Sequence, residues 1–161
     1  MEKKQKVKLT VAHVKCDNCG LECTLYFLSD FSYGERIVTT KNGKYCAYVN
    51  LFDENVTEEL TIICENILSN KGLVISKNKL GRLVSNVYPI TCDDIEGMKI
   101  ENTPNWKCPN CTNGKMEEDK EYGEKLDELE IPIVSHNAWK KLTEKEKEQL
   151  VINELEREGN V

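Results

Sequence analysis

Two Cys-x-x-Cys pairs carry the clearest chemical signal in the chain. Cys16 and Cys19 form the first pair, and Cys108 and Cys111 form the second. A pair with this spacing can wrap a turn around one half of a tetrahedral metal, and two such pairs supply the four thiolates of a structural zinc site. We therefore predict one Zn²⁺ ion per chain, bound by these four cysteines. Such a site joins two points of the chain that are separated by 88 residues.

Small and polar residues around both pairs suit a metal knuckle. Gly20 follows the first pair, and Thr112-Asn113-Gly114 follows the second. They permit the turn in which backbone amides donate hydrogen bonds to the thiolate sulfurs. Each pair also follows a segment that we expect to be extended, Val11–Lys15 for the first pair and Asn105–Lys107 for the second.

These flanking residues carry a resemblance to a known class of fold. Over Val14–Gly20 and Trp106–Lys115 the chain resembles a zinc ribbon that is split by a large insertion. The stretch Trp139–Lys147 is similar to tails of bacterial and phage proteins. The resemblance implies a structural zinc ion, a small bacterial or phage protein and, as in familiar ribbons, an association with nucleic acid.

The same cysteine spacing is compatible with two other chemistries. A thioredoxin-like dithiol places Cys-x-x-Cys at the start of a helix, and Trp106 beside Cys108-Pro109 invites that reading. Two separate metal sites would need extra ligands, and the candidates for them are His13, Cys23, Cys92 and His136. The bland alternative for the remaining cysteines, Cys23, Cys46, Cys64 and Cys92, is that they are strand residues or small buried hydrophobes.

The composition describes a globular protein with an uneven charge distribution. The chain has 161 residues and a net charge of −6, and the excess of acids lies entirely after Gly114. Most of it falls in Glu117–Glu130, which holds eight acids and two lysines. We expect no membrane span and no signal peptide, and therefore a cytoplasmic protein whose cysteines are reduced.

One basic stretch interrupts this pattern. Between Glu65 and Asp93 there is no acidic residue, and four cations occur: Lys71, Lys77, Lys79 and Arg82. We single them out as candidate nucleic-acid or anion contacts, since a helix pair with a basic second helix is a pattern that DNA readers use. The simpler interpretation is an amphipathic helix whose solvent face is basic.

Few residues in the chain are suited to catalysis. There are two histidines, and Ser135-His136-Asn137 is a fragment of the pattern of a His-Asn-His nuclease without its paired histidine. A zinc hydrolase would need an open coordination position, which four thiolates close. We therefore treat a metal-dependent nuclease or hydrolase as the last of three hypotheses.

Periodicity places the secondary structure around these motifs. Alternating apolar residues predict strands near Val7–Val11 and Leu21–Leu28, and Lys41-Asn42-Gly43 predicts a hairpin between two further strands. Apolar residues at helical spacing predict helices from Val56 to Leu68 and after Ser76. Glu117–Glu130 reads as an acidic connector, in part helical, and Thr143-x-x-Glu146 is a capping box that opens a last helix.

Together these features predict an α+β fold. We expect a small antiparallel sheet with two to three helices, clasped by the split zinc knuckles over residues 1–116, followed by an acidic, helical appendage over residues 117–161. The leading functional hypothesis is a non-enzymatic, zinc-stabilised binding or regulatory protein that acts through protein–protein contacts. The alternative is a nucleic-acid-associated zinc-ribbon protein that uses the Lys71–Arg82 patch. The sequence leaves the partner and the oligomeric state open.

Overall fold

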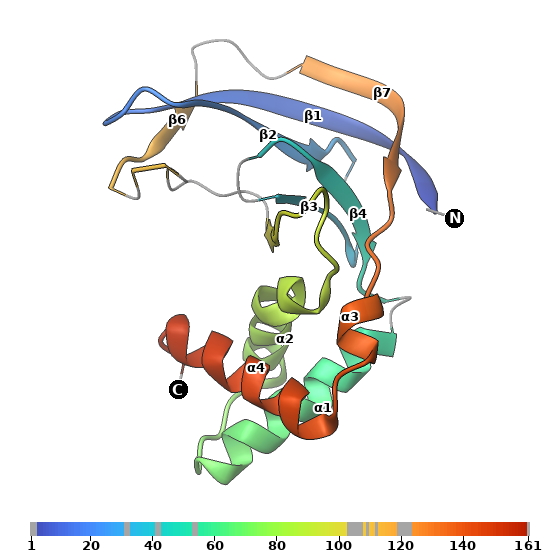
Figure 1. The fold of residues 1–161 in the computed structure, drawn as a ribbon, viewed down its shortest axis with the longest axis vertical. Coiled ribbons are helices and arrows are strands. Elements are labelled where there is room, and N and C mark those ends of the chain that lie inside the picture. Colours follow the sequence, from blue (N-terminus) through green and yellow to red (C-terminus); the bar gives the residue numbers. More distant parts are fainter. Residues whose placement is uncertain are drawn as a thin grey trace. The chain divides into compact units, whose positions relative to one another are not determined.

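The computed structural model confirms an α+β fold and separates strands from helices. It describes residues 3–30, 33–40, 43–52, 55–102, 108, 110–111, 113–118 and 124–160. The chain divides into two compact units: Met1–Asn50 with Asp94–Val134, and Leu51–Asp93 with Ser135–Val161. We call them the sheet unit and the helical unit, because the strands lie in the first and the helices in the second (Figure 1).

The sheet unit is organised around one long strand. Strand β1 (Lys4–Cys16) pairs antiparallel along one edge with β2 (Glu22–Leu28). Along its other edge it pairs with β7 (Glu124–Pro132) near its start and with β6 (Met116–Glu118) near its end. Strands β6 and β7, which follow the second cysteine pair in the chain, are therefore both hydrogen-bonded to β1.

A second sheet completes this unit. It consists of β3 (Glu35–Thr40), β4 (Cys46–Asn50) and β5 (Ile100–Asn102) in the order β4-β3-β5. The β3–β4 pairing confirms the predicted hairpin, although Lys41 and Asn42 of its turn lie outside the described residues. Gly43 has a φ of 71°, in the left-handed region that glycine adopts at no steric cost.

The two halves of strand β1 contribute opposite faces to two hydrophobic clusters. In its first half Val7 and Leu9 pack in a cluster with Ile37, Tyr48 and Ile131. Since side chains alternate across a strand, the even-numbered residues of its second half lie on the other face. These residues pack in a second cluster, which contains Ala12, Val14, Cys16, Leu25, Cys108 and Met116. Cys16 and Cys108 thus belong to a hydrophobic cluster that is separate from the one around Val7 and Leu9.

The described parts of the acidic segment are strands. The prediction of a partly helical connector over Glu117–Glu130 was wrong there, because the segment supplies the end of β6 and most of β7, while residues 119–123 lie outside the described residues. A bulge hides the strand in the sequence: the pairing with β1 shifts between Val7 and Leu9, and Glu128 adopts a φ of 54°. The bulge brings Leu126 opposite Leu9 and Leu129 opposite Val7, although the two leucines are three positions apart and their partners on β1 only two.

The helical unit packs three main helices together. Helix α1 (Asn55–Asn70) contacts α2 (Lys77–Val87) and α4 (Glu144–Arg157), and α2 also contacts α4. A 3₁₀ turn, η1 (Tyr88–Thr91), follows α2 and has Pro89 in its first turn. The buried side chains of α1 are those of the predicted apolar stripe, including Leu60, Cys64 and Ile67.

Capping interactions fix the ends of these helices as the sequence predicted. The Ser76 side chain accepts a hydrogen bond from the Lys79 amide at the start of α2, and the Thr143–Glu146 capping box opens α4. The short helix α3 (Asn137–Lys140) is capped from a distance by Asp93, which accepts hydrogen bonds from the amides of Asn137 and Ala138.

The compact units differ from the predicted division into residues 1–116 and 117–161. Residues on both sides of Met116 belong to the sheet unit, and the last helix packs on α1 and α2 rather than forming an appendage of its own. Among the described helices, none combines the length and the apolar character needed to cross a membrane.

Candidate metal centre

The first cysteine pair occupies the tight turn between β1 and β2. Cys16 is the last residue of β1, and its amide donates to the Leu21 carbonyl at 2.8 Å, while the Gly20 amide donates to the Cys16 carbonyl at 3.1 Å. Gly20 has a φ of 79°, which explains the glycine after the pair. Cys19 lies within this turn and is exposed, whereas Cys16 is buried.

The second pair is brought to this turn by β6. Cys16 lies opposite Met116 in the β1–β6 pairing, and the Asp17 amide donates to the Lys115 carbonyl at 3.1 Å. In return the Lys115 amide donates to the Asp17 carboxylate at 2.9 Å. These bonds join the segment after Cys111 to the first knuckle, so the chain closes on itself through backbone contacts as well as through the cysteines.

The four predicted cysteines meet at one point. One sulfur atom from each of Cys16, Cys19, Cys108 and Cys111 lies within 4.8 Å of the other three. The Sγ atoms of Cys16 and Cys111 are 3.6 Å apart, and those of Cys19 and Cys108 are 3.5 Å apart. A tetrahedron with metal–sulfur bonds of about 2.3 Å has sulfur–sulfur edges of about 3.8 Å. The cluster therefore has the dimensions of a tetrahedral site and can hold a metal ion.

The contacts between the pairs are not disulfides. A disulfide bond holds its sulfurs about 2.0 Å apart, and all four cysteines are free thiols. The thioredoxin-like alternative also lacks its structural context, because Cys108 and Cys111 precede strand β6. Thiol groups from two different turns that share one point are typical of metal ligation rather than of a redox pair.

Backbone amides surround the sulfur atoms in the same way in both turns. The Asn18 amide donates to Cys16 Sγ at 3.4 Å, and the Asn110 amide donates to Cys108 Sγ at 3.4 Å. The Cys19 amide also donates to Cys16 Sγ at 3.4 Å. Such N–H···S bonds orient the ligands and favour the thiolate form.

The two asparagines act across the cluster. Asn110 Nδ2 lies 3.7 Å from Cys19 Sγ, and a side-chain hydrogen bond from Asn18 reaches Cys111. Each turn thus supplies a side-chain donor to the second cysteine of the other turn. The sequence carries a signal for this role, because both pairs have asparagine at the same position, in Cys-Asp-Asn-Cys and Cys-Pro-Asn-Cys. The prediction from cysteine spacing did not include these asparagines.

Hydrogen bonds and mutual repulsion separate the pKa values of the thiols. The side-chain hydrogen bond from Asn18 lowers the pKa of Cys111 to about 6. The amide of Leu21 and the side chain of Asn110 lower the pKa of Cys19. At Cys108 the amide of Cys111 also acts to lower the pKa, but desolvation and the neighbouring sulfurs raise it to about 11. Since the cluster resists holding four negative charges, a bound cation would stabilise it.

A glycine is required beside the cluster. A Cβ atom at Gly114 would lie 2.1 Å from Cys16 Sγ, 3.1 Å from the Asn18 Cβ and 3.1 Å from Asp17 Oδ1. The Gly114 carbonyl also accepts a hydrogen bond from the Cys108 amide at 3.1 Å. Gly114 therefore lets the second turn approach the first closely enough for the sulfurs to meet.

The other candidate ligands lie outside the cluster. Within the described part of the chain, the metal-competent group contains only the four cysteines of the two pairs. Cys23 belongs to β2 and packs partly buried against the same core; desolvation and the sulfurs of Cys19 and Cys16 raise its pKa. Cys92 lies in the helical unit, with its Sγ 4.0 Å from the Tyr88 carbonyl, and His13 is exposed on β1.

His136 is a structural residue of the helical unit. It is 4% exposed, and its ring nitrogens contact Tyr88 Oη at 3.1 Å and the Thr91 carbonyl at 2.9 Å. Asn137 begins α3, and Trp139 is buried, so this segment is the start of a helix. A ring that is buried and hydrogen-bonded at both nitrogens is poorly placed to act as a general base.

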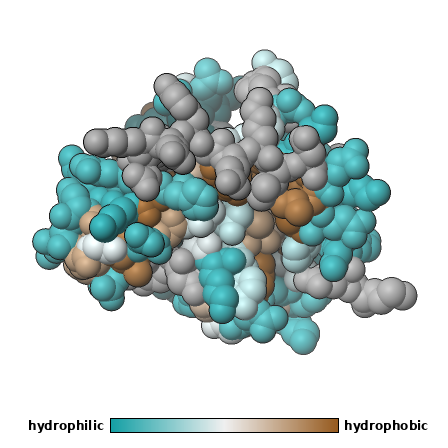
Figure 2. All heavy atoms as spheres, turned by 90° about the horizontal axis from the view of Figure 1, so that it is seen from above, coloured by the Kyte–Doolittle hydropathy of each residue, from teal (hydrophilic) through white to brown (hydrophobic). Residues whose placement is uncertain are grey.

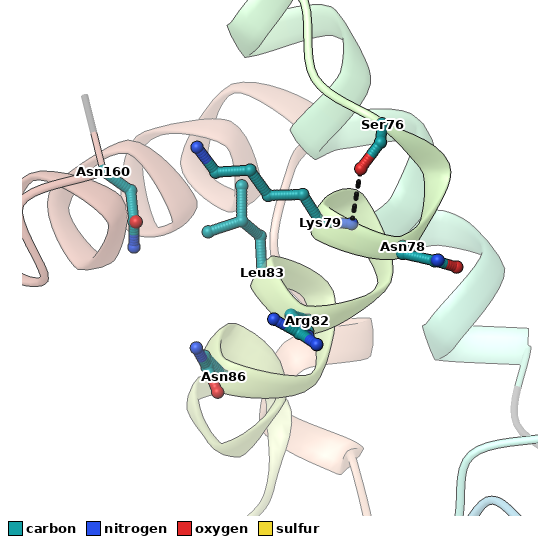
Figure 3. A pocket seen from close by; sticks show the side chains of 7 residues that line it. All are labelled: Ser76, Asn78, Lys79, Arg82, Leu83, Asn86 and Asn160. Carbon is teal, nitrogen blue, oxygen red and sulfur yellow. Dashed lines mark hydrogen bonds between the residues drawn. The ribbon is translucent and has the colours of Figure 1, made fainter.

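The four basic candidate residues do not lie together at one site. Lys79 and Arg82 line a pocket on α2 (Figure 3), whereas Lys77 is exposed outside it. Lys71 follows α1 and lies 4.0 Å from Glu156 of α4. Whether any of these side chains contacts nucleic acid or another anion stays a prediction.

Comparison with known proteins gives no relative from which a role could be transferred. No protein-family model matches the chain, and no similar curated protein and no similar solved structure was found.

Proposed function

We propose that the cysteine cluster binds one zinc ion per chain and that this ion has a structural role. Zinc suits a site of four thiolates because it accepts sulfur ligands in tetrahedral geometry and is redox-inert. The observation that carries the proposal is the meeting of Cys16, Cys19, Cys108 and Cys111 within 4.8 Å. The reciprocal hydrogen bonds of Asn18 and Asn110 support it, since ligand orientation by neighbouring donors is typical of metal sites.

Four thiolates leave no position for substrate or water. A catalytic zinc site has three protein ligands and an open fourth position. The proposed ion instead fastens the turn between β1 and β2 to the segment that leads into β6. On this basis the site resembles a zinc ribbon in its knuckles, with the intervening strands and helices carried between them.

The proposed biochemical role is a zinc-stabilised binding or regulatory protein that acts through protein–protein contacts. On the face seen in Figure 2, hydrophilic residues predominate among the coloured atoms, and hydrophobic ones show between them. Individual large apolar side chains are nevertheless exposed in both units, Tyr33 in one and Phe52, Ile62 and Val74 in the other. Val74 is 97% exposed and follows Leu73, which is 44% exposed. Leu73 and Val74 are adjacent, and this exposed apolar pair is suited to a protein contact.

Metal analysis of the purified protein tests the structural part of this proposal. We expect one zinc per chain, and we expect Cys108→Ser to lose the metal and destabilise the fold, because metal-binding free energy is folding free energy in such sites. Cys46→Ser serves as the matched control, since Cys46 lies in the same unit but outside the cluster. A metal-free protein that unfolds at the same temperature as the zinc-bound one would contradict the proposal.

The salt dependence of binding separates protein contacts from nucleic-acid contacts. Binding to DNA or RNA that weakens steeply with salt, and that is lost when Lys77, Lys79 and Arg82 are reversed to glutamate, would support the nucleic-acid alternative and contradict a pure protein binder. Retention of a protein partner by the same charge-reversed variant would support the proposal.

A further inference from the structure

A pocket on the helical unit lies away from the cysteines. It has a volume of about 370 Å³ and is lined by seven residues: Ser76, Asn78, Lys79, Arg82, Leu83, Asn86 and Asn160. Sites for small ligands are typically concavities of about 300–1,000 Å³. Six of the lining residues come from α2 and its cap, and Asn160 comes from the chain after α4 (Figure 3).

Two cations line the pocket, and the described part of the chain offers neither of them an ion pair. Lys79 and Arg82 are three residues apart on α2, so their side chains project from neighbouring positions of one helix face. Among the described residues, neither side chain forms an ion pair, in contrast to Lys71 and Lys147, which lie beside Glu156 and Glu59. The pocket therefore holds two positive charges that form no ion pair with the described residues.

The remaining lining adds hydrogen-bonding groups and no carboxylate. Asn78, Asn86, Asn160 and Ser76 are polar and neutral, and none of the seven residues is acidic. Leu83 is 5% exposed and supplies the one apolar contribution to the lining. A site with two cations, amide groups and a small apolar surface favours a ligand that has one compact anionic group and a neutral remainder.

The far wall of the pocket is held in place by a helix end. Gly159 has a φ of 74°, the Asn160 amide donates to the Leu155 carbonyl at 2.9 Å, and the Gly159 amide donates to the Glu156 carbonyl at 3.0 Å. This pattern is a Schellman motif, which terminates α4 and fixes the following residue. Backbone hydrogen bonds thereby fix the position of Asn160 at the pocket.

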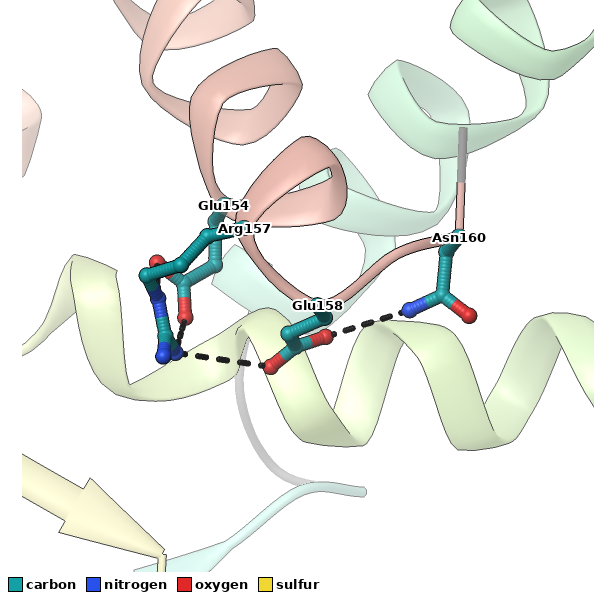
Figure 4. Close-up of polar contacts among 4 residues, drawn as sticks. All are labelled: Glu154, Arg157, Glu158 and Asn160. Atoms are coloured by element: carbon teal, nitrogen blue, oxygen red, sulfur yellow. Dashed lines mark hydrogen bonds and ion pairs between the residues drawn. The ribbon is translucent and has the colours of Figure 1, made fainter. Parts of the chain in front are cut away.

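The acid that Asn160 contacts is itself paired. Glu158 accepts a hydrogen bond from Asn160 Nδ2 at 3.3 Å and lies 3.8 Å from Arg157 Nη2, and Arg157 also pairs with Glu154 (Figure 4). The bond from Asn160 to Glu158 orients the amide, and Arg157 balances the carboxylate. The carboxylates of Glu154 and Glu158 are therefore engaged with Arg157 and Asn160.

We propose that this pocket binds the phosphate group of a small phosphate ester, through Lys79 and Arg82. Arginine matches the geometry of a phosphate with a fork of N–H donors, and lysine adds a mobile point charge. The asparagines and Leu83 then contact the neutral part of the ligand. A small ligand fits better than a nucleic acid because both cations line one concavity, while Lys77 lies outside it and Lys71 is beside Glu156.

Titration of the full-length protein with inorganic phosphate, adenosine monophosphate and adenosine tests the proposal. We expect saturable, one-to-one binding of adenosine monophosphate, competition by inorganic phosphate and no binding of adenosine. Arg82→Ala and Lys79→Ala should each weaken binding by about tenfold, since each removes one contact between a charged donor and the phosphate. Both side chains are exposed, so neither substitution removes core packing.

Lys77→Ala is the matched control, because it removes the same charge from the same helix without touching the pocket. We expect this variant to bind like the wild type. Three results would overturn the proposal: no saturable binding of either phosphate compound up to about 10 mM, an equal loss in Lys77→Ala, or tighter binding of a single-stranded oligonucleotide with a steep salt dependence. The last result would indicate a nucleic-acid surface instead.

Discussion

Replacing Gly114 by alanine is predicted to disable the cysteine cluster without touching a cysteine. The added methyl group would lie 2.1 Å from Cys16 Sγ, whereas ordinary van der Waals contact begins at about 3.4 Å. The two atoms must therefore separate by more than 1 Å. Metal sites tolerate displacements of only about 0.2 Å in ligand distance, so Gly114→Ala should remove Cys16 from the coordination sphere.

Neither way of relieving the clash preserves the site. The Cys16 side chain has a single torsion, and rotating it takes the sulfur away from the other three. Moving the backbone of Gly114 instead breaks the hydrogen bond from the Cys108 amide to the Gly114 carbonyl and pushes against Asn18 and Asp17, whose atoms lie 3.1 Å from the new methyl. Loss of a single orienting contact weakens metal binding by about 10- to 100-fold. Loss of a ligand should weaken it by about 100-fold or more.

Competition between the protein and a zinc chelator of known affinity measures this effect. Gly81→Ala is the matched control: Gly81 lies in α2, and an added Cβ there has no atom within 4 Å. Alanine is also the better helix former, so this control should bind zinc like the wild type. If Gly114→Ala binds zinc as tightly as Gly81→Ala, the geometry derived for the cluster is wrong.

Two further predictions concern the thiols and their donors. The pKa of Cys108 is raised to about 11, so metal binding at pH 7 must displace the proton of this thiol. The pKa of Cys111 is lowered to about 6, so zinc affinity should fall further as the pH drops through about 6 and protons compete for Cys111. Calorimetry in buffers of different ionisation enthalpy detects the released proton, and zinc binding that is independent of pH between about 5 and 8 would contradict this. Asn18→Ala and Asn110→Ala should each weaken zinc binding by about tenfold, as orienting donors do, whereas Asn113→Ala, on an exposed residue of the second turn, should not. Equal affinities for all three variants, measured by chelator competition, would show that the side-chain bonds across the cluster do not matter.

The cysteine cluster was predictable because its signal is local and chemical. Spacing and thiol chemistry alone indicated that Cys16 and Cys19 would meet Cys108 and Cys111, and the structure brings their sulfur atoms together. The helices of the second unit were predictable for a similar reason, since Ser76 and the Thr143–Glu146 box are caps that act within one turn.

Strand β7 was not predictable because its pattern depends on a partner. Leu126 and Leu129 are three residues apart, which reads as helical spacing, and acidic residues surround them. In the structure a bulge at Glu128, with a φ of 54°, lets both leucines pair opposite apolar residues of β1. A single sequence contains the leucines but not the bulge, which forms only when β1 is alongside.

Local sequence patterns likewise could not predict the organisation into two units. The helical unit is assembled from Leu51–Asp93 and Ser135–Val161. Between these segments the chain returns to the sheet unit. Contacts such as those of Glu59 with Trp139 Nε1, at 2.5 Å, and with Lys147, at 3.1 Å, join residues about eighty positions apart. Periodicity carries no information about such pairings.

Zinc-edge X-ray absorption on the purified protein, with elemental analysis of the same sample, tests the central proposal most directly. We predict one zinc per chain with four sulfur neighbours at about 2.3 Å and no oxygen or nitrogen ligand. Fewer than four sulfur neighbours, or a folded protein that takes up no zinc, would contradict a structural ion held by Cys16, Cys19, Cys108 and Cys111.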